Sequence, residues 1–192
     1  MGKRFWCANL FFVLMLASCR SLHPGDLLFH VVAEDNHITS VTSGRIDHVA
    51  IYLGHDSVIE AIPLKGVTTT PLHTVLHREQ GHYIRCRVKD ADIKKTISNA
   101  FNYLGRPYDS LYLADNHAIY CSELVVFSFV DHHDNLVFEQ SRMTFHDSTN
   151  TIPIYWQELY ARHGMKVPEG APGTNPSELE RHSSLRLQKS IK

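Results

Sequence analysis

The sequence has no surplus of basic residues, no internal repeat, and no hydrophobic run of the roughly 20 residues that a bilayer-spanning helix needs. Lysine and arginine number 19 against 20 aspartate and glutamate residues, which gives a formal net charge of -1. A nucleic-acid-binding protein normally carries a basic surplus, so we expect no nucleic acid partner. Hydrophobic residues make up 43% of the 192 residues and charged residues 20%, a balance that excludes global disorder.

Cysteine is also scarce, with four residues, whereas histidine is abundant, with fourteen. Structural zinc sites need four such side chains at short, characteristic spacings. His73 and His77 are four residues apart, and His132 and His133 are adjacent, but no third ligand accompanies either pair. We therefore predict no metal site and no cofactor, and we interpret most of the histidines as surface residues.

The longest apolar run, Leu10–Ala17, follows the basic residues Lys3 and Arg4. It is too short to cross a bilayer but has the length of the hydrophobic part of a secretory signal peptide. The run ends in Leu16-Ala17-Ser18-Cys19, which resembles the lipobox of bacterial lipoproteins. This resemblance implies a signal peptide over residues 1–18, a lipidated Cys19, and export to the cell envelope with a membrane anchor. An ordinary signal peptide or an uncleaved anchor is the alternative.

Strands predominate in the first half of the remaining chain and helices in the second half. Alternating or β-branched segments predict strands, and hydrophobic stripes with capping residues such as Asp35 predict helices. We expect strands over residues 27–32, 46–53, 57–62, 66–70 and 82–88, and helices over residues 36–42, 71–79, 93–104, 120–130 and 154–163. This order predicts an α+β domain over residues 22–167. The proline-, glycine- and serine-rich segment 168–192 is predicted to be an extended tail, partly packed on the domain.

Among the cysteines, Cys121 has the position that thiol chemistry would use. It lies at the start of the apolar helix predicted over residues 120–130, where the helix dipole favours a thiolate. Cys86 instead alternates with Ile84 and Val88 in a predicted strand, which indicates a small buried residue. Cys121 is therefore the candidate nucleophile, with a core position at the head of an apolar helix as the alternative.

Two polar residues interrupt otherwise apolar strands in the first half of the chain. His48 precedes Val49-Ala50-Ile51-Tyr52-Leu53, and Glu60 lies within the next predicted strand. If these strands pair around the turn Gly54-His55-Asp56, the two side chains lie side by side. His48 could then serve as a base towards a thiol while Glu60 accepts a hydrogen bond from its other nitrogen. A hydrogen-bonded structural histidine and an exposed glutamate are the alternatives.

Five segments of the sequence, in this order, resemble the permuted papain-fold amidases of the NlpC superfamily, in particular the YiiX/YaeF-like group. The segments are Pro24-Gly25-Asp26-Leu27-Leu28-Phe29, Asp47-His48-Val49-Ala50-Ile51-Tyr52-Leu53, Val58-Ile59-Glu60-Ala61, Gly105-Arg106-Pro107-Tyr108-Asp109 and Tyr120-Cys121-Ser122-Glu123-Leu124-Val125. The histidine precedes the cysteine, which is the permuted order. The resemblance covers most of residues 22–176. It implies a circularly permuted papain-like fold, in which an antiparallel sheet packs against helices and the cysteine begins a helix.

By position, the resemblance assigns Cys121 as nucleophile, His48 as general base and Glu60 as the third polar member of a triad. It also implies a role for the Tyr108 hydroxyl near the oxyanion or the substrate carbonyl, with Tyr112 and Tyr120 as nearby rivals. The implied function is a cysteine peptidase or amidase that cleaves peptide or isopeptide bonds of the envelope through a thioester. The alternatives are a lipid acyl hydrolase or acyltransferase with the same triad, and a catalytically silent envelope binding module. The oligomeric state stays open.

Overall fold

The computed structural model describes residues 22–78, 80–114 and 116–191, apart from the side chains of residues 188–190. The predicted signal peptide and the predicted lipidation site at Cys19 lie outside these residues. In chain order, the elements are β1 (Leu27–Val32), β2 (Ile46–Gly54), β3 (Ser57–Ile62), β4 (Gly66–Pro71), α1 (Leu72–Leu76), β5 (Gly81–Val88), α2 (Ile93–Phe101), α3 (Cys121–Ser128), β6 (Ser141–Arg142), α4 (Ile154–Arg162), β7 (Pro172–Gly173), α5 (Pro176–Glu180) and β8 (Leu185–Ile191). No helix among the described residues is long and apolar enough to cross a membrane.

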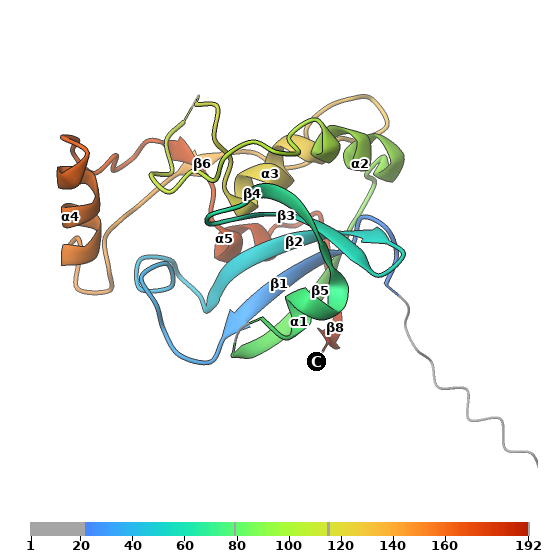
Figure 1. Cartoon of the computed structure of the whole chain (residues 1–192), viewed down its shortest axis with the longest axis horizontal. Helices are drawn as coiled ribbons and strands as arrows, with labels where there is room; N and C mark the ends of the chain where they lie inside the picture. Colours follow the sequence, from blue (N-terminus) through green and yellow to red (C-terminus); the bar gives the residue numbers. More distant parts are fainter. Residues whose placement is uncertain (1–21, 79, 115, 192) are drawn as a thin grey trace, which may run out of the picture.

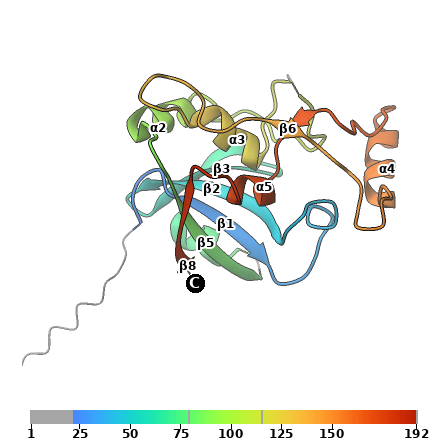
Figure 2. The ribbon, with the colours of Figure 1, turned by 180° about the vertical axis from the view of Figure 1, so that it is seen from behind.

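Within the described residues, six strands form one sheet in the order β4-β3-β2-β1-β5-β8, with antiparallel pairing throughout. The first four strands follow one another across the sheet, and β5 then pairs with the free edge of β1. Figures 1 and 2 show α2 and α3 running along one side of this twisted sheet. Helix α4 stands apart from the sheet at one end of the molecule (Figure 1).

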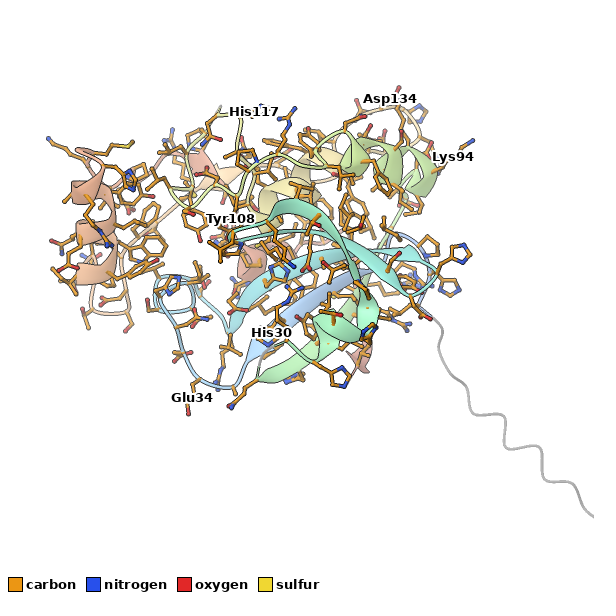
Figure 3. All side chains as sticks on the ribbon, viewed as in Figure 1. His30, Glu34, Lys94, Tyr108, His117 and Asp134 are labelled. Atoms are coloured by element: carbon orange, nitrogen blue, oxygen red, sulfur yellow. The ribbon has the colours of Figure 1, made fainter. Side chains whose placement is uncertain are left out.

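The segment 36–42 forms hydrogen-bonded turns, so the helix predicted there is wrong. Asn36 explains the difference, because its side-chain carbonyl accepts hydrogen bonds from the amides of Ile38 at 2.9 Å and Thr39 at 3.1 Å. Such local side-chain bonds compete with the helical ladder. The segment belongs to the loop between β1 and β2, on which Glu34 is labelled in Figure 3. This loop borders the site described below.

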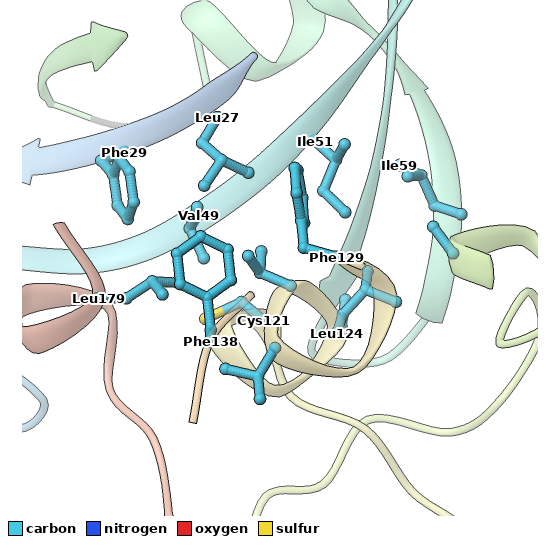
Figure 4. Packing of buried hydrophobic residues seen from close by; sticks show 14 of the residues in the cluster. Leu27, Phe29, Val49, Ile51, Ile59, Cys121, Leu124, Phe129, Phe138 and Leu179 are labelled. Carbon is cyan, nitrogen blue, oxygen red and sulfur yellow. The ribbon is translucent and has the colours of Figure 1, made fainter. Parts of the chain in front are cut away.

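The two faces of the sheet bury separate apolar clusters because successive strand residues point in opposite directions. One cluster joins the sheet to α3, and Figure 4 shows its centre. Its members include Leu27, Phe29, Val49, Ile51, Ile59, Leu124, Phe129, Phe138 and Leu179. The alternate residues Leu28, Ala50 and Tyr52 pack on the other face with Val75 of α1. Helix α3 has buried residues all around its axis, which is typical of a helix enclosed in a core.

The C-terminal segment, expected as an extended tail over residues 168–192, contributes α5 and β8. The Asn175 side chain caps α5 by accepting from the amide of Glu178 at 2.8 Å. Leu179 of this helix is buried in the cluster shown in Figure 4. Strand β8 then pairs with β5, from Val88↔Leu185 to Tyr83↔Ile191. The segment therefore completes both the core and one edge of the sheet.

A close approach between β4 and the segment after α2 fixes the loop that carries Tyr108. The amide of Val67 donates to the carbonyl of Arg106 at 2.9 Å, and the amide of Gly105 donates to the carbonyl of Val67 at 2.8 Å. Gly66 makes this approach possible, because it has a φ of +68° and a Cβ added to it would lie 2.0 Å from the Arg106 carbonyl oxygen.

Replacement of Gly66 by alanine should therefore lower the free energy of unfolding by about 3 kcal/mol, since it adds a backbone clash to a strained φ. Gly105→Ala is the matched control. Its φ is +82°, but an added Cβ would meet nothing within 4 Å. The control should lose only about 1 kcal/mol, from the left-handed conformation alone. Urea denaturation measures both values, and equal losses would contradict the role assigned to the close approach.

Candidate active site

His48 and Glu60 come together because β2 and β3 are joined by a tight turn and pair antiparallel. The Nε2 atom of His48 lies 2.8 Å from Oε2 of Glu60. The Glu60 side chain is fully buried, whereas His48 retains 16% exposure. A buried carboxylate needs hydrogen-bond partners, and His48 supplies one of them. The structure thus places side by side the two polar residues that interrupt these strands.

Cys121 is the first residue of α3, and its side chain lies close enough to His48 to act as a hydrogen-bonding and charge partner of that ring. Residue Tyr120 before it has an extended backbone, and the first hydrogen bond of the helix runs from the Leu124 amide to the Tyr120 carbonyl at 3.0 Å. The amides of residues 121–123 consequently have no acceptor within the helix. They form the positive end of the helix dipole beside the sulfur. Cys121 is buried, with 4% exposure, and is a free thiol.

The contacts of the site shift the pKa values of His48 and Glu60 in opposite directions. Burial alone would lower the pKa of His48, but hydrogen bonds to Cys121 and Glu60 and the negative charges of both raise it to about 10. Burial alone would raise the pKa of Glu60, but hydrogen bonds from His48 and Arg78 lower it to about 2. At neutral pH the arrangement therefore favours a charged imidazolium on His48 beside an ionised Glu60 carboxylate.

Arg78 is a member of this network that the sequence did not reveal. Its guanidinium donates to Oε2 of Glu60 at 3.0 Å and to Oε1 at 2.5 Å. This two-point geometry is the strongest form of charge pairing available to a carboxylate. Arg78 follows α1, which is shorter than the predicted helix 71–79, so its position depends on how that turn packs. The only signal in the sequence was that a buried Glu60 would need a second partner.

Of the three tyrosines considered, two lie beside the site. The Tyr108 and Tyr112 hydroxyls are 3.4 Å apart, and both rings line the cleft that contains His48. The Tyr120 hydroxyl instead accepts a hydrogen bond from the amide of Thr174 at 3.0 Å. Burial, together with the nearby Tyr112 and the charge of Cys121, raises the pKa of Tyr108 well above its usual value. Its hydroxyl therefore stays protonated and can donate.

A cleft of about 450 Å³ opens onto these residues. Figure 3 shows Tyr108 at the margin of the sheet. The wall consists of residues from the loop between β1 and β2, from the strand ends, from the loop before α3, and from α4. The lining residues are Asn36, His37, Ile38, Asp47, His48, Ile62, Pro63, Arg78, Tyr108, Ser110, Tyr112 and Tyr155. The cleft is large enough for a peptide segment, and its wall mixes aromatic and polar side chains.

Comparison with known protein families identifies the chain. A family model described as "Permuted papain-like amidase enzyme, YaeF/YiiX, C92 family" matches residues 21–187. The chain belongs to this family. It is therefore an enzyme of the cysteine peptidase and amidase type, as the resemblance of its motifs implied. The arrangement of His48 on a strand before Cys121 on a helix fits the permuted order of that family.

A solved structure supports the fold. The crystal structure of "metalloprotein yiiX from Escherichia coli O157:H7" superposes with a TM-score of 0.71, at 21% sequence identity, over 88% of this chain and 97% of that chain. Both comparisons confirm the predicted α+β, permuted papain-like fold of this amidase. Comparison with curated proteins gave no match.

The Escherichia coli protein is called a metalloprotein, which raises the question whether the described residues of this amidase could hold a metal ion. Within residues 22–191, gaps at 79 and 115 excepted, no three His, Cys, Asp or Glu side chains gather in a group that could hold a metal ion. His77 uses its Nδ1 to bond the carbonyl of His73 at 2.7 Å, so the pair with i, i+4 spacing is engaged locally. The described residues therefore do not fit a resident metal ion.

Proposed function

We propose that this amidase cleaves peptide or isopeptide bonds of cell-envelope material, with Cys121 as nucleophile, His48 as acid and base, and Glu60 as the residue that orients His48. One observation carries the proposal: the His48 ring is held between Cys121 and the buried carboxylate of Glu60. The base thus lies between a nucleophile and an orienting acceptor, which is the arrangement that nucleophilic catalysis requires. Of these three residues, His48 lines the cleft.

In the first step, the Cys121 sulfur attacks the carbonyl carbon of the amide, and the carbonyl oxygen becomes an oxyanion. The amides at the start of α3 can donate to this oxygen, and the helix dipole favours its charge. The protonated hydroxyl of Tyr108 is a side-chain donor in the same cleft, with the Tyr112 hydroxyl beside it. Removal of one such donor typically costs about 10²-fold or more in rate.

In the second step, the imidazolium of His48 gives its proton to the departing nitrogen as the C–N bond breaks. A thioester on Cys121 and a free amine result. Water then attacks the thioester carbon while His48 takes a proton from it, and cleavage of the C–S bond releases a carboxylic acid. Glu60 keeps the ring oriented and stabilises its positive charge through both steps.

The character of the cleft supports amide substrates over lipid acyl chains. An acyl hydrolase needs a long apolar groove, whereas this cleft contains Asp47, Arg78 and several hydroxyl groups. The more apolar cavity beside α4, lined by residues that include Met143 and Trp156, has a volume of only about 40 Å³. Envelope placement rests on the lipobox-like sequence that ends at Cys19. A lipid-anchored enzyme at the envelope meets wall and envelope peptides as its nearest amide substrates.

Labelling with iodoacetamide, read residue by residue by peptide mass spectrometry, tests the triad. The wild-type protein should be labelled at Cys121 at neutral pH, and Cys121→Ala should lose this label. His48→Ala should react at least about 10²-fold more slowly, since the base no longer holds the thiolate. If the lipid anchor is present, the same spectra should show an N-terminal peptide that begins at an acylated Cys19.

Cys86→Ala is the matched control for this experiment. Burial, together with the charges of Glu180 and Asp26, raises the pKa of the Cys86 thiol to about 12, so this residue should not compete for the reagent. The control should label at residue 121 like the wild type. An unchanged labelling rate at Cys121 in His48→Ala would exclude His48 as its base.

A further inference from the structure

Asp47, which directly precedes His48 on β2, has a carboxylate to which the proposed chemistry assigns no task. Its Oδ1 accepts from Nδ1 of His30 at 2.8 Å, and its Oδ2 accepts from Nδ2 of Asn36 at 2.7 Å. The side chain retains 11% exposure. A carboxylate offers about four acceptor positions, so the two hydrogen bonds leave others available. Asp47 is thus a rigidly held anion with remaining acceptor capacity.

The remaining acceptor positions of Asp47 lie at the wall of the cleft that contains His48. Asp47 lines the cleft that contains His48 and Tyr108, and it also lines a second cavity of about 190 Å³. Glu34 lines the second cavity as well, and the described residues that line it include no lysine or arginine. Figure 3 shows His30 near the end of β1 and Glu34 on the loop that follows. The two cavities therefore share one carboxylate as part of their common wall.

The cations of the cleft already have anionic partners. Glu60 binds both Arg78 and His48, and His48 also contacts Cys121. Burial tends to raise the pKa of Asp47, but hydrogen bonds from His30 and Asn36 and the nearby charge of His48 lower it, so the carboxylate is ionised at neutral pH. A negative charge in a cleft whose cations are already paired attracts a cationic ligand.

The aromatic residues of the cleft suit the same ligand. The rings of His37 and Tyr155 have centroids 4.3 Å apart, and both line the cleft. Tyr108 and Tyr112 add two more rings. The faces of tyrosine rings attract ammonium groups, at about 0.5 to 1 kcal/mol for an exposed site. Carboxylate and rings together form the kind of pocket that holds a primary ammonium group.

We propose that Asp47 is a specificity-determining residue, which binds a primary ammonium group on the substrate close to the scissile amide. This inference rests on the proposed function, because it assumes that Cys121 attacks in this cleft. The ammonium group belongs either to the free amino terminus of a peptide or to an amine-bearing side chain. Both have the same chemistry, and the test separates them.

Chloromethyl ketones that alkylate Cys121 make the test possible without knowledge of the natural substrate. The Cys121 sulfur forms a C–S bond and displaces chloride, which leaves with the electron pair of the C–Cl bond. The first pair of probes is alanyl-alanine chloromethyl ketone with a free amino group and its N-acetyl form. The second pair is the N-acetyl-lysine and N-acetyl-norleucine chloromethyl ketones. In at least one pair, the amine-bearing probe should label wild-type Cys121 about 10- to 100-fold faster, which is the worth of one charge-assisted hydrogen bond.

Asp47→Asn should abolish this preference, because the amine-bearing probe loses more rate than the uncharged probe of the same pair. The matched control is Asp35→Asn, which removes an equal charge from the exposed neighbouring loop and touches neither cavity. This control should keep the wild-type preference. The comparison of probes on the wild-type protein needs no variant, so it stands even if Asp47→Asn does not fold.

Two results would overturn the inference while leaving the proposed function intact: equal rates for both members of each probe pair on wild type, or a preference that Asp47→Asn leaves unchanged. A different result would overturn the proposed function and the inference together. That result is the failure of every probe, iodoacetamide included, to label Cys121.

Discussion

Amide hydrolysis should fall by roughly 10⁴-fold or more when Cys121 is replaced by alanine, and by a similar factor in His48→Ala. Without the sulfur, no thioester forms, and without the imidazole, no group protonates the departing nitrogen. The double variant should be no slower than either single variant, because the two residues act as one unit. The measurement is the release of aminomethylcoumarin from the aminoacyl-coumarin amide that wild type cleaves fastest in a panel of such amides.

The control for this prediction is again Cys86→Ala, which lacks the other free thiol of the described residues. It should keep the wild-type rate. Rate losses that multiply in the double variant would contradict the model of one catalytic unit. A Cys121→Ala protein that retains more than a few per cent of the activity would exclude Cys121 as nucleophile.

Arg78→Met should lower the free energy of unfolding at pH 7 by about 3 kcal/mol. Arg78 binds both oxygens of a carboxylate that is completely buried, and its removal leaves that charge with His48 as its remaining cationic partner. Arg45→Met is the matched control. Arg45 lies 4.0 Å from Asp35, with both side chains more than half exposed. Exposed pairs of this kind contribute little, so the control should change stability by less than about 0.5 kcal/mol.

The pH dependence of stability follows from the same pair. The folded pKa of Glu60, about 2, lies below its ordinary value of 4.5, so the protein gains stability from this group at every pH above 4.5 and loses it as the pH falls towards 2. The folded pKa of His48 lies above its ordinary value of 6.5, so its contribution is complete below 6.5 and is lost as the pH rises through about 10. In Arg78→Met the pKa of Glu60 should rise, and the loss of stability between pH 4.5 and 2 should become shallower. Chemical denaturation at several pH values measures these slopes, and an unchanged acid slope would contradict the pairing.

The sequence predicted those parts of the structure that depend on neighbours along the chain. The pairing of His48 with Glu60 follows from two apolar strands joined by a short turn, and the strand positions agree with the structure to within a residue or so at each end. The position of Cys121 at the start of a helix follows from the apolar segment behind it. Each of these features is fixed by local patterns that period and turn residues reveal.

Features that depend on tertiary packing were not predictable in the same way. The contact of Arg78 with Glu60 requires the turn after α1 to fold over β3, and no periodic pattern records that. Residues 36–42 have helix-compatible spacing, but the Asn36 side chain stabilises turns instead. Strand β8 forms by pairing with an open edge of β5, so its composition alone indicated only an extended segment.

The direction of β2 has a consequence for where the enzyme can work. His48 lies near the beginning of this strand, whereas Gly25 is tied to its far end through a 2.7 Å hydrogen bond to the Tyr52 carbonyl. These two points are separated by roughly 13 Å along the strand, at about 3.3 Å per residue. If Cys19 carries the proposed lipid, the bilayer is tethered to the Gly25 end and the catalytic residues lie at the opposite one. The enzyme would then act at a short radius from its tether.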